Sequence, residues 1–428
     1  MLFPLNRKVV LASAIAMASQ VSFVQAAGYG INEQSASYLG TGFAGRASNA
    51  IDASISATNP AGISFLEGGT QMSVGVDVIL EGGEFEGQRS YFDLASGQNK
   101  TDSGKTEDFQ KTAFVPFGYL VVPFDDKWTF GLAGYAPYGI VLDYEDGWVG
   151  EGFGQKTSVQ VMNLQGTASY KFNDDFSVGF GLIGSHVKGE LTSKFSGIDG
   201  SIEGDDNALA WNIGAIWNVS ENTTLGLAYH SKLDFTLEGE MDKSAPFNSS
   251  DDVELSIVMP EKLMASVTHK LDDQWTVMAD VTWTRWSRFE EFNVVSAVDG
   301  GSESYVPMNW KNTWALSLGT SYQLDEYWLL RAGYMFDESP VSNETRTVRS
   351  PDANRNWFTF GANLKASNNM NIDFAYAYVK LQDGSIEESK HIHPDNTNEP
   401  DLAPSYGTVS GNYSSSSHIF GVQLNYLF

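Results

Sequence analysis

Apolar and polar residues alternate with a period of two in a long series of segments that runs from Thr70 to Phe428. In one such segment Leu209, Trp211 and Ile213 share one face, while Asn212 and Gly214 share the other. Successive side chains of a β-strand point to opposite faces, so this period is typical of strands with one apolar and one polar face. The pattern predicts about fourteen strands, at 70–80, 111–122, 128–144, 157–172, 176–188, 208–219, 224–238, 262–271, 275–289, 310–324, 327–337, 354–364, 370–380 and 416–428.

The connections between these segments alternate between short polar turns, such as 173–175 and 272–274, and long segments, such as 81–110 and 381–415. Outer-membrane barrels have short periplasmic turns and longer extracellular loops, and an even strand number returns the chain to the periplasm. We therefore predict an all-β fold, a transmembrane antiparallel β-barrel of about fourteen strands over residues 70–428. A tandem of soluble β-sandwich domains is the alternative for a chain of this length.

Two N-terminal segments lie outside this pattern. Residues 1–26 carry Arg7 and Lys8, then an apolar stretch, then a small-residue cleavage pattern ending at Ala26, which together predict a signal peptide. Residues 27–69 are rich in Gly, Ala, Ser and Asn. We interpret them as a hatch that fills the barrel lumen, with a disordered periplasmic tail as the alternative. These features predict export to the bacterial outer membrane.

Composition excludes several classes of function. The chain has 53 acidic and 26 basic residues, and loss of the two signal-peptide cations would move its net charge from −27 to −29. Such a chain repels phosphate backbones, so no nucleic-acid partner is expected. It has no cysteine, and its six histidines, His391 and His393 included, show no spacing typical of a catalytic triad or a zinc site. We expect no catalytic residue, no metal and no cofactor, so the protein is not expected to be an enzyme.

Several blocks carry a family resemblance. They are Gly30–Ser37, Asn59–Gly62, Ala279–Phe289, Asn309–Trp314, Leu330–Pro340 and Pro351–Arg355. In this order they resemble successive blocks of the FadL-type outer-membrane long-chain fatty-acid transport proteins, over most of the mature chain. The resemblance implies passive uptake of long-chain fatty acids or related hydrophobic compounds through an extracellular apolar groove, a lumen pocket and lateral release at a kinked third strand. A general diffusion porin or a surface receptor for phage or adhesion is the alternative.

The third predicted strand contains Gly131, Gly134, Pro137 and Gly139. A proline removes a hydrogen-bond donor from the strand ladder and belongs at an edge or a bulge. Because a closed barrel has no edge, this sequence predicts a break or an inward kink in the wall, which would serve as a lateral opening. The alternative is a proline near the fraying outer end of the strand.

Other candidate site residues come from the hatch, the lumen and the loops. Asn59, Pro60 and Ala61 resemble the family's hatch tripeptide, and we interpret them as a structural element of the hatch. Arg46, Arg331 and Lys262 are candidate cations for a ligand carboxylate, although most lumen arginines pair with acidic residues. Further ligand candidates are the apolar loop residues Leu191, Phe195, Ile202, Met241 and Phe247, for which packing of the loops on themselves is the alternative, and Val306 and Met308, which fall where the family has charged pocket side chains.

The expected partners follow from these interpretations. They are a long-chain fatty acid or another hydrophobic small molecule, outer-membrane lipid with lipopolysaccharide, and the barrel-assembly machinery, which would bind the C-terminal strand ending in Tyr426, Leu427 and Phe428. The protein is expected to be a monomer. The sequence leaves open whether the ligand is a fatty acid or an aromatic hydrocarbon.

Overall fold

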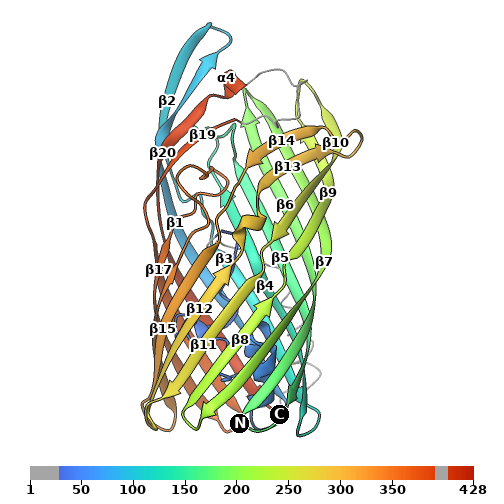
Figure 1. The fold of residues 1–428 in the computed structure, drawn as a ribbon. Helices are drawn as coiled ribbons and strands as arrows, with labels where there is room; N and C mark the ends of the chain where they lie inside the picture. Colours follow the sequence, from blue (N-terminus) through green and yellow to red (C-terminus); the bar gives the residue numbers. More distant parts are fainter. Residues whose placement is uncertain (1–27, 391–402) are drawn as a thin grey trace, which may run out of the picture.

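Fourteen antiparallel strands close into a barrel in the computed structural model, which describes residues 28–390 and 403–428 (Figure 1). Each strand pairs with its neighbour along the chain, and the last strand pairs with the first over Gln71–Ser90 and Thr408–Leu427. The predicted signal peptide lies outside the described residues. The barrel strands are β1 (Gln71–Asp93), β3 (Ala113–Pro123), β4 (Trp128–Asp143), β5 (Lys156–Lys171), β6 (Phe176–Phe195), β7 (Ile198–Ser220), β8 (Thr223–His230), β11 (Lys262–Lys270), β12 (Trp275–Thr284), β15 (Thr313–Gln323), β16 (Trp328–Asp337), β17 (Arg355–Ser367), β18 (Met370–Leu381) and β20 (Thr408–Leu427).

The alternation along the chain separates the two faces of this wall. On β7, Leu209 is 78% exposed on the outside, whereas Asn212 is fully buried on the lumen side. On β18 the outward Phe374 is 43% exposed and the inward Asp373 is buried. An apolar outer face and a polar inner face are what a barrel in lipid requires. The predicted all-β barrel is therefore confirmed.

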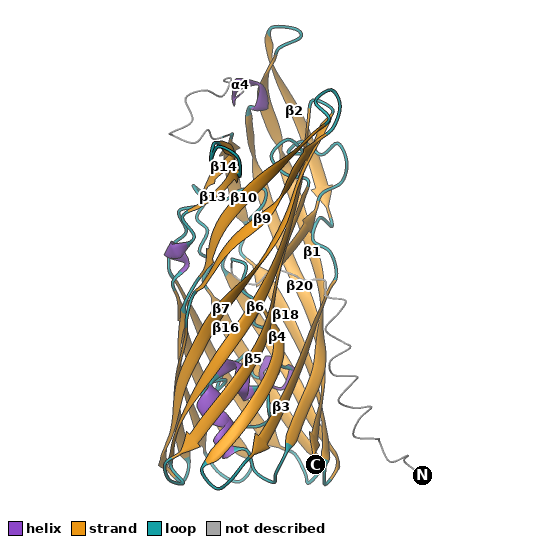
Figure 2. Cartoon of the chain, turned by 90° about the vertical axis from the view of Figure 1, so that its right-hand side faces the viewer, coloured by secondary structure: helices purple, strands orange, loops and turns teal. Residues whose placement is uncertain are grey.

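The long connections contain more strand than the sequence predicted. Six further strands extend the wall on the extracellular side (Figure 2). They are β2 (Gln98–Glu107), β9 (Leu233–Lys243), β10 (Ser249–Met259), β13 (Glu291–Ser296), β14 (Ser302–Pro307) and β19 (Gly384–Ser389).

Two predicted strand boundaries were wrong for the same reason. The predicted strand 224–238 is two strands, because β8 ends at His230 and β9 pairs instead with β7 and β10. The predicted strand 275–289 ends at Thr284 and is followed by the 3-10 helix η3 (Trp286–Arg288). Alternation continues through these regions because one face packs on an apolar interior and the other meets water. Period two alone does not distinguish lipid from water on the outer face.

The hatch lies in the lower half of the lumen, where its short helices are enclosed by the strands (Figure 2). It contains α2 (Ala36–Leu39), α3 (Ile55–Thr58) and the 3-10 helix η2 (Pro60–Phe65). One more short helix, α4 (Ala403–Tyr406), lies on the extracellular side. Within residues 28–390 and 403–428, no helix is long and apolar enough to cross a membrane.

The hatch rests on the wall where the wall lacks side chains. A Cβ atom added to Gly214 of β7 would come within 2.0 Å of the Asn59 side chain. One added to Gly226 of β8 would come within 1.9 Å of the Ala47 carbonyl oxygen. At these two positions only glycine lets the hatch backbone approach the strands so closely.

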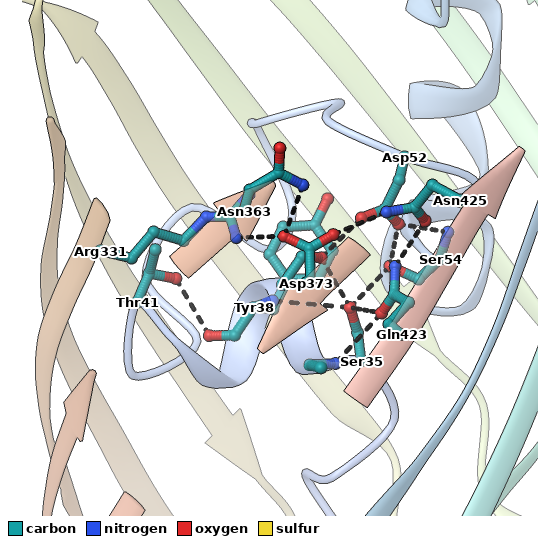
Figure 3. A network of polar contacts seen from close by, with 12 residues as sticks. Ser35, Tyr38, Thr41, Asp52, Ser54, Arg331, Asn363, Asp373, Gln423 and Asn425 are labelled. Carbon is teal, nitrogen blue, oxygen red and sulfur yellow. Dashed lines mark hydrogen bonds and ion pairs between the residues drawn. The ribbon is translucent and has the colours of Figure 1, made fainter. Parts of the chain in front are cut away.

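Buried polar contacts also join the hatch to the far wall (Figure 3). The Ser35 hydroxyl donates to Gln423 Oε1 of β20 at 2.9 Å. On the neighbouring strand, Asp373 of β18 forms an ion pair with Arg331 of β16 and accepts a hydrogen bond of 2.6 Å from Asn425. Such groups are stable at this depth because each has a partner.

Candidate functional site

β4 is bulged at Pro137. Its pairing with β5 runs regularly up to Tyr135 and Asn163 and resumes at Tyr138 and Val161, so β4 carries one extra residue across this step. A bulge bends the strand that carries it, and proline is compatible with one because it has no N–H to lose.

Above this bulge β4 parts from β3. The two strands pair only from Gly118 and Gly134 down to the periplasmic turn. In the described chain the next bridge on this side joins Gln110 to Leu142, eight residues further along β4. The wall therefore has a gap between the upper halves of β3 and β4.

The N-terminal segment of the hatch takes the place of β3 along this part of β4. Ile31 N–H donates to the Pro137 carbonyl at 2.9 Å, and Gly139 N–H donates to the Tyr29 carbonyl at 2.7 Å. These bonds satisfy backbone groups that would otherwise be unpaired in the wall, where an unsatisfied group is costly.

A cavity lies between the hatch and the bulge. Together with its mouth it encloses about 1090 Å³, and we call it the lower cavity. It is lined by Gly30, Ile31, Asn32, Gln34, Ser35, Tyr38, Phe43, Arg46, Ser54, Ala57, Thr58, Tyr135, Pro137, Tyr138, Asn163, Ile183, Ala210, His230, Ser231, Leu233, Lys262, Met264, Thr282, Thr284, Trp286, Thr313, Ala315 and Asp337. Aromatic and aliphatic side chains thus share this cavity with polar ones.

The cations of the lower cavity differ in how they are paired. Arg46 forms an ion pair of 3.3 Å with Asp280 and donates to Thr282 at 2.7 Å. Lys262 lies 4.6 Å from the centre of the Tyr138 ring, and no carboxylate of the described chain lies within 4.0 Å of its Nζ. Lys262 is therefore the cavity cation with an open position for an anion.

A second, apolar cavity lies above the first, among the extracellular strands. Together with its open side it measures about 480 Å³, and we call it the upper groove. It is lined by Tyr29, Val159, Gly189, Leu191, Ile202, Glu203, Gly204, Leu237, Gly239, Val253, Glu254, Leu255, Ile257, Phe289 and Phe292. Its lining is mostly aliphatic and aromatic, as binding sites for hydrophobic molecules are.

The N-terminal segment separates the two cavities. Tyr29 lines the upper groove, whereas Gly30 and Ile31 line the lower cavity. Rings hold it in place: the Tyr29 ring packs edge-on against Trp310 at 5.2 Å, and Trp310 packs against Trp286 at 5.1 Å. Burial raises the pKa of Tyr29 to about 12, so its hydroxyl stays neutral.

The connection between β16 and β17 folds inward and holds the same segment from above. The carboxylate of Asp352, which is fully buried, accepts hydrogen bonds from Gly28 N–H at 2.8 Å and from Arg355 at 2.6 Å. The Tyr29 hydroxyl lies 3.0 Å from that of Ser350. Movement of the N-terminal segment would therefore have to break contacts to this connection as well as to β4.

The structure brings together only part of the predicted site. Leu191 and Ile202 line the upper groove, and Met241 is buried opposite Ile202 on the next strand. Arg46 and Pro137 line the lower cavity. Three of these residues thus lie in or beside the upper groove, and the other two line the lower cavity.

The other predicted residues lie elsewhere. Phe195 stacks on Tyr406 at 3.8 Å, and Phe247 is 63% exposed. Met308 is buried in the apolar cluster beside the groove, with Val306 packed against that cluster. Arg331 is paired with Asp373 and lines neither cavity.

The remaining predicted positions belong to the wall and the hatch. A Cβ atom at Gly134 would meet open space, and one at Gly131 would touch Ile63 of the hatch at 3.5 Å. Asn59 begins η2 and accepts a hydrogen bond from Ala61 N–H at 3.1 Å. Pro60 follows it and is buried.

Sequence reasoning did not include Tyr29, Tyr138 or Trp286 among the site residues. Tyr29 and Tyr138 flank segments that it did single out, the hatch blocks and the Pro137 region. Aromatic side chains beside these segments could have indicated that the two residues belong to the site. The position of Trp286 depends on η3, which replaced a predicted strand.

Comparisons with known proteins agree with this architecture. Residues 15–428 match the family described as outer membrane protein transport protein (OMPP1/FadL/TodX). The chain is 28% identical to outer membrane protein P1 of Haemophilus influenzae, covering 97% of this chain and 98% of that protein. It is 26% identical to the long-chain fatty acid transport protein of Escherichia coli K12, covering 90% and 94%.

Solved structures share the fold. A Pseudomonas aeruginosa FadL homologue superposes with a TM-score of 0.83 at 22% identity, covering 94% of this chain and all of that one. The Ralstonia pickettii toluene transporter TbuX superposes with a TM-score of 0.65 at 18% identity, covering 90% and 97%. The family match covers nearly the whole chain, and so the protein belongs to the OMPP1/FadL/TodX family of outer-membrane transport proteins for hydrophobic compounds.

Proposed function

We propose that this protein carries long-chain fatty acids or related hydrophobic compounds passively across the outer membrane. The route starts in the upper groove, continues into the lower cavity and leaves sideways between β3 and β4. The observation that carries the proposal is the position of the lower cavity, whose lining includes Pro137 and Tyr138 at the place where β3 and β4 part.

Lateral exit suits this lumen. The hatch fills its lower half and is tied to the wall through Asn59 and Ser35, so a path straight through would require those buried bonds to break. A gap in the wall leads instead into lipid, where an apolar ligand is more stable than in water. The same filled lumen argues against a general diffusion porin.

The lower cavity favours a hydrophobic ligand with an acidic head. Its aromatic and aliphatic lining residues suit an alkyl chain, and Lys262 forms no ion pair with a carboxylate within 4.0 Å in the described chain. A charged hydrogen bond in such a site contributes about 1.5–3 kcal/mol. This supports a fatty acid over an unsubstituted aromatic hydrocarbon.

Uptake of radiolabelled oleate by a strain without its own transporter tests both parts of the proposal. The wild-type chain should restore uptake. Deletion of Pro137 removes the extra residue of the bulge, lets β4 pair with β3, and should abolish most uptake. Pro123→Ala, at the periplasmic end of β3, is the matched control and should transport normally.

The outcomes separate the two claims. If the wild-type chain restores no uptake although it reaches the outer membrane folded, the transport function is wrong. If the Pro137 deletion transports as well as the wild type, transport stands and the lateral route is wrong.

A further inference from the structure

Four basic side chains lie side by side on the outer surface, where the barrel strands reach their extracellular ends. Lys232 follows β8, Arg285 and Arg288 follow β12, and Lys311 precedes β15. These elements are neighbours in the wall, because β8 pairs with β11, β11 with β12, and β12 with β15. We call these four residues the cationic row; Arg288 belongs to η3.

An aromatic row lies directly below it. Tyr229 of β8, Trp283 of β12 and Trp314 of β15 lie in one row across neighbouring strands, since Tyr229 and Trp283 both pair with Leu263, and Trp283 pairs with Trp314. Trp314 is 52% exposed on the outer face. Aromatic girdles mark the boundary between the hydrocarbon and the headgroups. The cationic row, one step further out, therefore lies at the level of the lipid headgroups.

The charges within the row do not balance. Arg285 and Arg288 share one carboxylate, Glu261, at 3.1 Å and 2.8 Å. Hydrogen bonds from both arginines hold the pKa of Glu261 at about 2 even though burial alone would raise it. Lys232 pairs with Asp234, and Lys311 pairs with Glu338. Four cations thus face three carboxylates in a chain whose net charge is −27.

The arginines also retain donors for a further anion. Arg285 reaches Glu261 through Nη1 alone, and its side chain is 45% exposed. Arg288 uses Nε and Nη2 and is 34% exposed. The guanidinium fork matches the geometry of a phosphate group and can bind it through two parallel hydrogen bonds.

We propose that the cationic row binds the phosphate groups of lipopolysaccharide in the outer leaflet, with the acyl chains of that lipid lying along the aromatic row and the apolar strand faces below. Solvent-exposed ion pairs alone would contribute little to stability. A lipid phosphate explains instead why the surplus cation occurs at this level of the wall. This binding is independent of the proposed route for hydrophobic ligands.

The test measures binding of lipid A to the purified, folded full-length chain in nanodiscs of neutral lipid. The probes are lipid A with both phosphates and lipid A from which the phosphates have been removed. The variant Glu261→Gln/Arg285→Gln/Arg288→Gln removes the arginine pair without leaving an unpaired buried carboxylate. Lys100→Gln/Lys105→Gln, on the hairpin of β1 and β2 at the extracellular tip of the molecule, is the matched control.

We expect the wild type and the control to bind phosphorylated lipid A alike and to prefer it over the dephosphorylated form. The triple variant should bind at least about fivefold more weakly, since each cation near a charged lipid surface contributes about that factor. Added salt should weaken binding to the wild type more than to the variant.

Equal binding of the two lipid A forms, or unchanged binding by the triple variant, would overturn the proposal. If the triple variant does not fold, Lys232→Gln/Lys311→Gln tests the same row and should also weaken binding to phosphorylated lipid A. Unchanged binding there counts against the proposal equally.

Discussion

Lys262 shows how one residue bears on the choice of ligand. Its ammonium group lies over the Tyr138 ring on the wall of the lower cavity, while the neighbouring Arg46 is neutralised by Asp280. A buried cation that forms no direct ion pair is costly, and an anionic ligand would reduce that cost. Because of Lys262, the lower cavity should be more stable with an anionic ligand than with a neutral one.

Lys262→Gln should weaken oleate binding by roughly tenfold, as expected for loss of a charged hydrogen bond. Binding of oleyl alcohol, which has the same chain without the carboxylate, should hardly change. Titration of the detergent-solubilised protein, followed by tryptophan fluorescence, measures both because Trp286 also lines the lower cavity.

Lys243→Gln, on β9 and away from the lower cavity, is the control for the change of charge. If Lys262→Gln affects acid and alcohol equally, the lysine shapes the cavity rather than binding the carboxylate.

At the scale of elements, β4 changes its backbone partner along its length. The extracellular strand β19 helps to hold the connection that covers the new partner. β4 leaves β3 at the bulge and pairs with the N-terminal segment instead. The β16–β17 connection covers that segment and is held in turn by β19, where Glu388 accepts a hydrogen bond of 2.7 Å from Val348 N–H. The gap in the wall is thus covered from inside by elements that depend on one another.

We call the β16–β17 connection together with β19 the extracellular cap, and Glu388 should make this cap sensitive to pH. Burial raises its pKa from about 4.5 to about 7 in the folded protein. A group with a raised folded pKa gives its full stabilisation below the unfolded pKa, and this is lost as pH rises through the folded pKa. Resistance of the cap to proteolysis should therefore be higher at pH 5 than at pH 8.

Glu388→Gln keeps an acceptor oxygen for Val348 without the charge. It should protect the cap at pH 8 as well as at pH 5, and Glu387→Gln, exposed on the same strand, should leave the pH dependence intact. A wild-type cap that is more resistant at pH 8 than at pH 5 would contradict the sign of this prediction.

At the scale of the whole molecule, function depends on how the hatch sits in the barrel. Asn59 is fully buried and donates to the Ala47 carbonyl at 2.7 Å and to the Ala215 carbonyl of β7 at 3.1 Å. One side chain thereby joins two parts of the hatch to the wall. A second network, drawn in Figure 3, joins Ser35 of the hatch to Gln423 of β20.

Asn59→Ala should loosen the hatch, since a buried group that loses its partner costs about 1–3 kcal/mol. We expect ion conductance in planar bilayers to rise, with more frequent openings than the wild type, while the barrel itself stays folded and heat-modifiable on gels. Asn222→Ala, in an exposed periplasmic turn, is the control. A wild-type conductance trace for Asn59→Ala would show that the hatch does not depend on this residue.

The sequence by itself determined the wall. Its period of two gave the number and order of the barrel strands, because every strand must present one face to lipid and the other to the lumen. It also pointed to an irregularity at Pro137, since a proline between glycines has no N–H to donate to the strand ladder. These features depend only on local order along the chain.

The tertiary structure decided the site. Arg46 forms an ion pair with Asp280, which is distant in sequence, and this contact leaves Lys262 rather than Arg46 available to bind an anion. Period two continues unchanged from β8 into β9, so only the pairing partners show that the wall ends at His230 and a groove begins. Ion-pair partners and cavities form where segments that are distant in sequence pack together. The alternation along one strand does not indicate which residues lie opposite it.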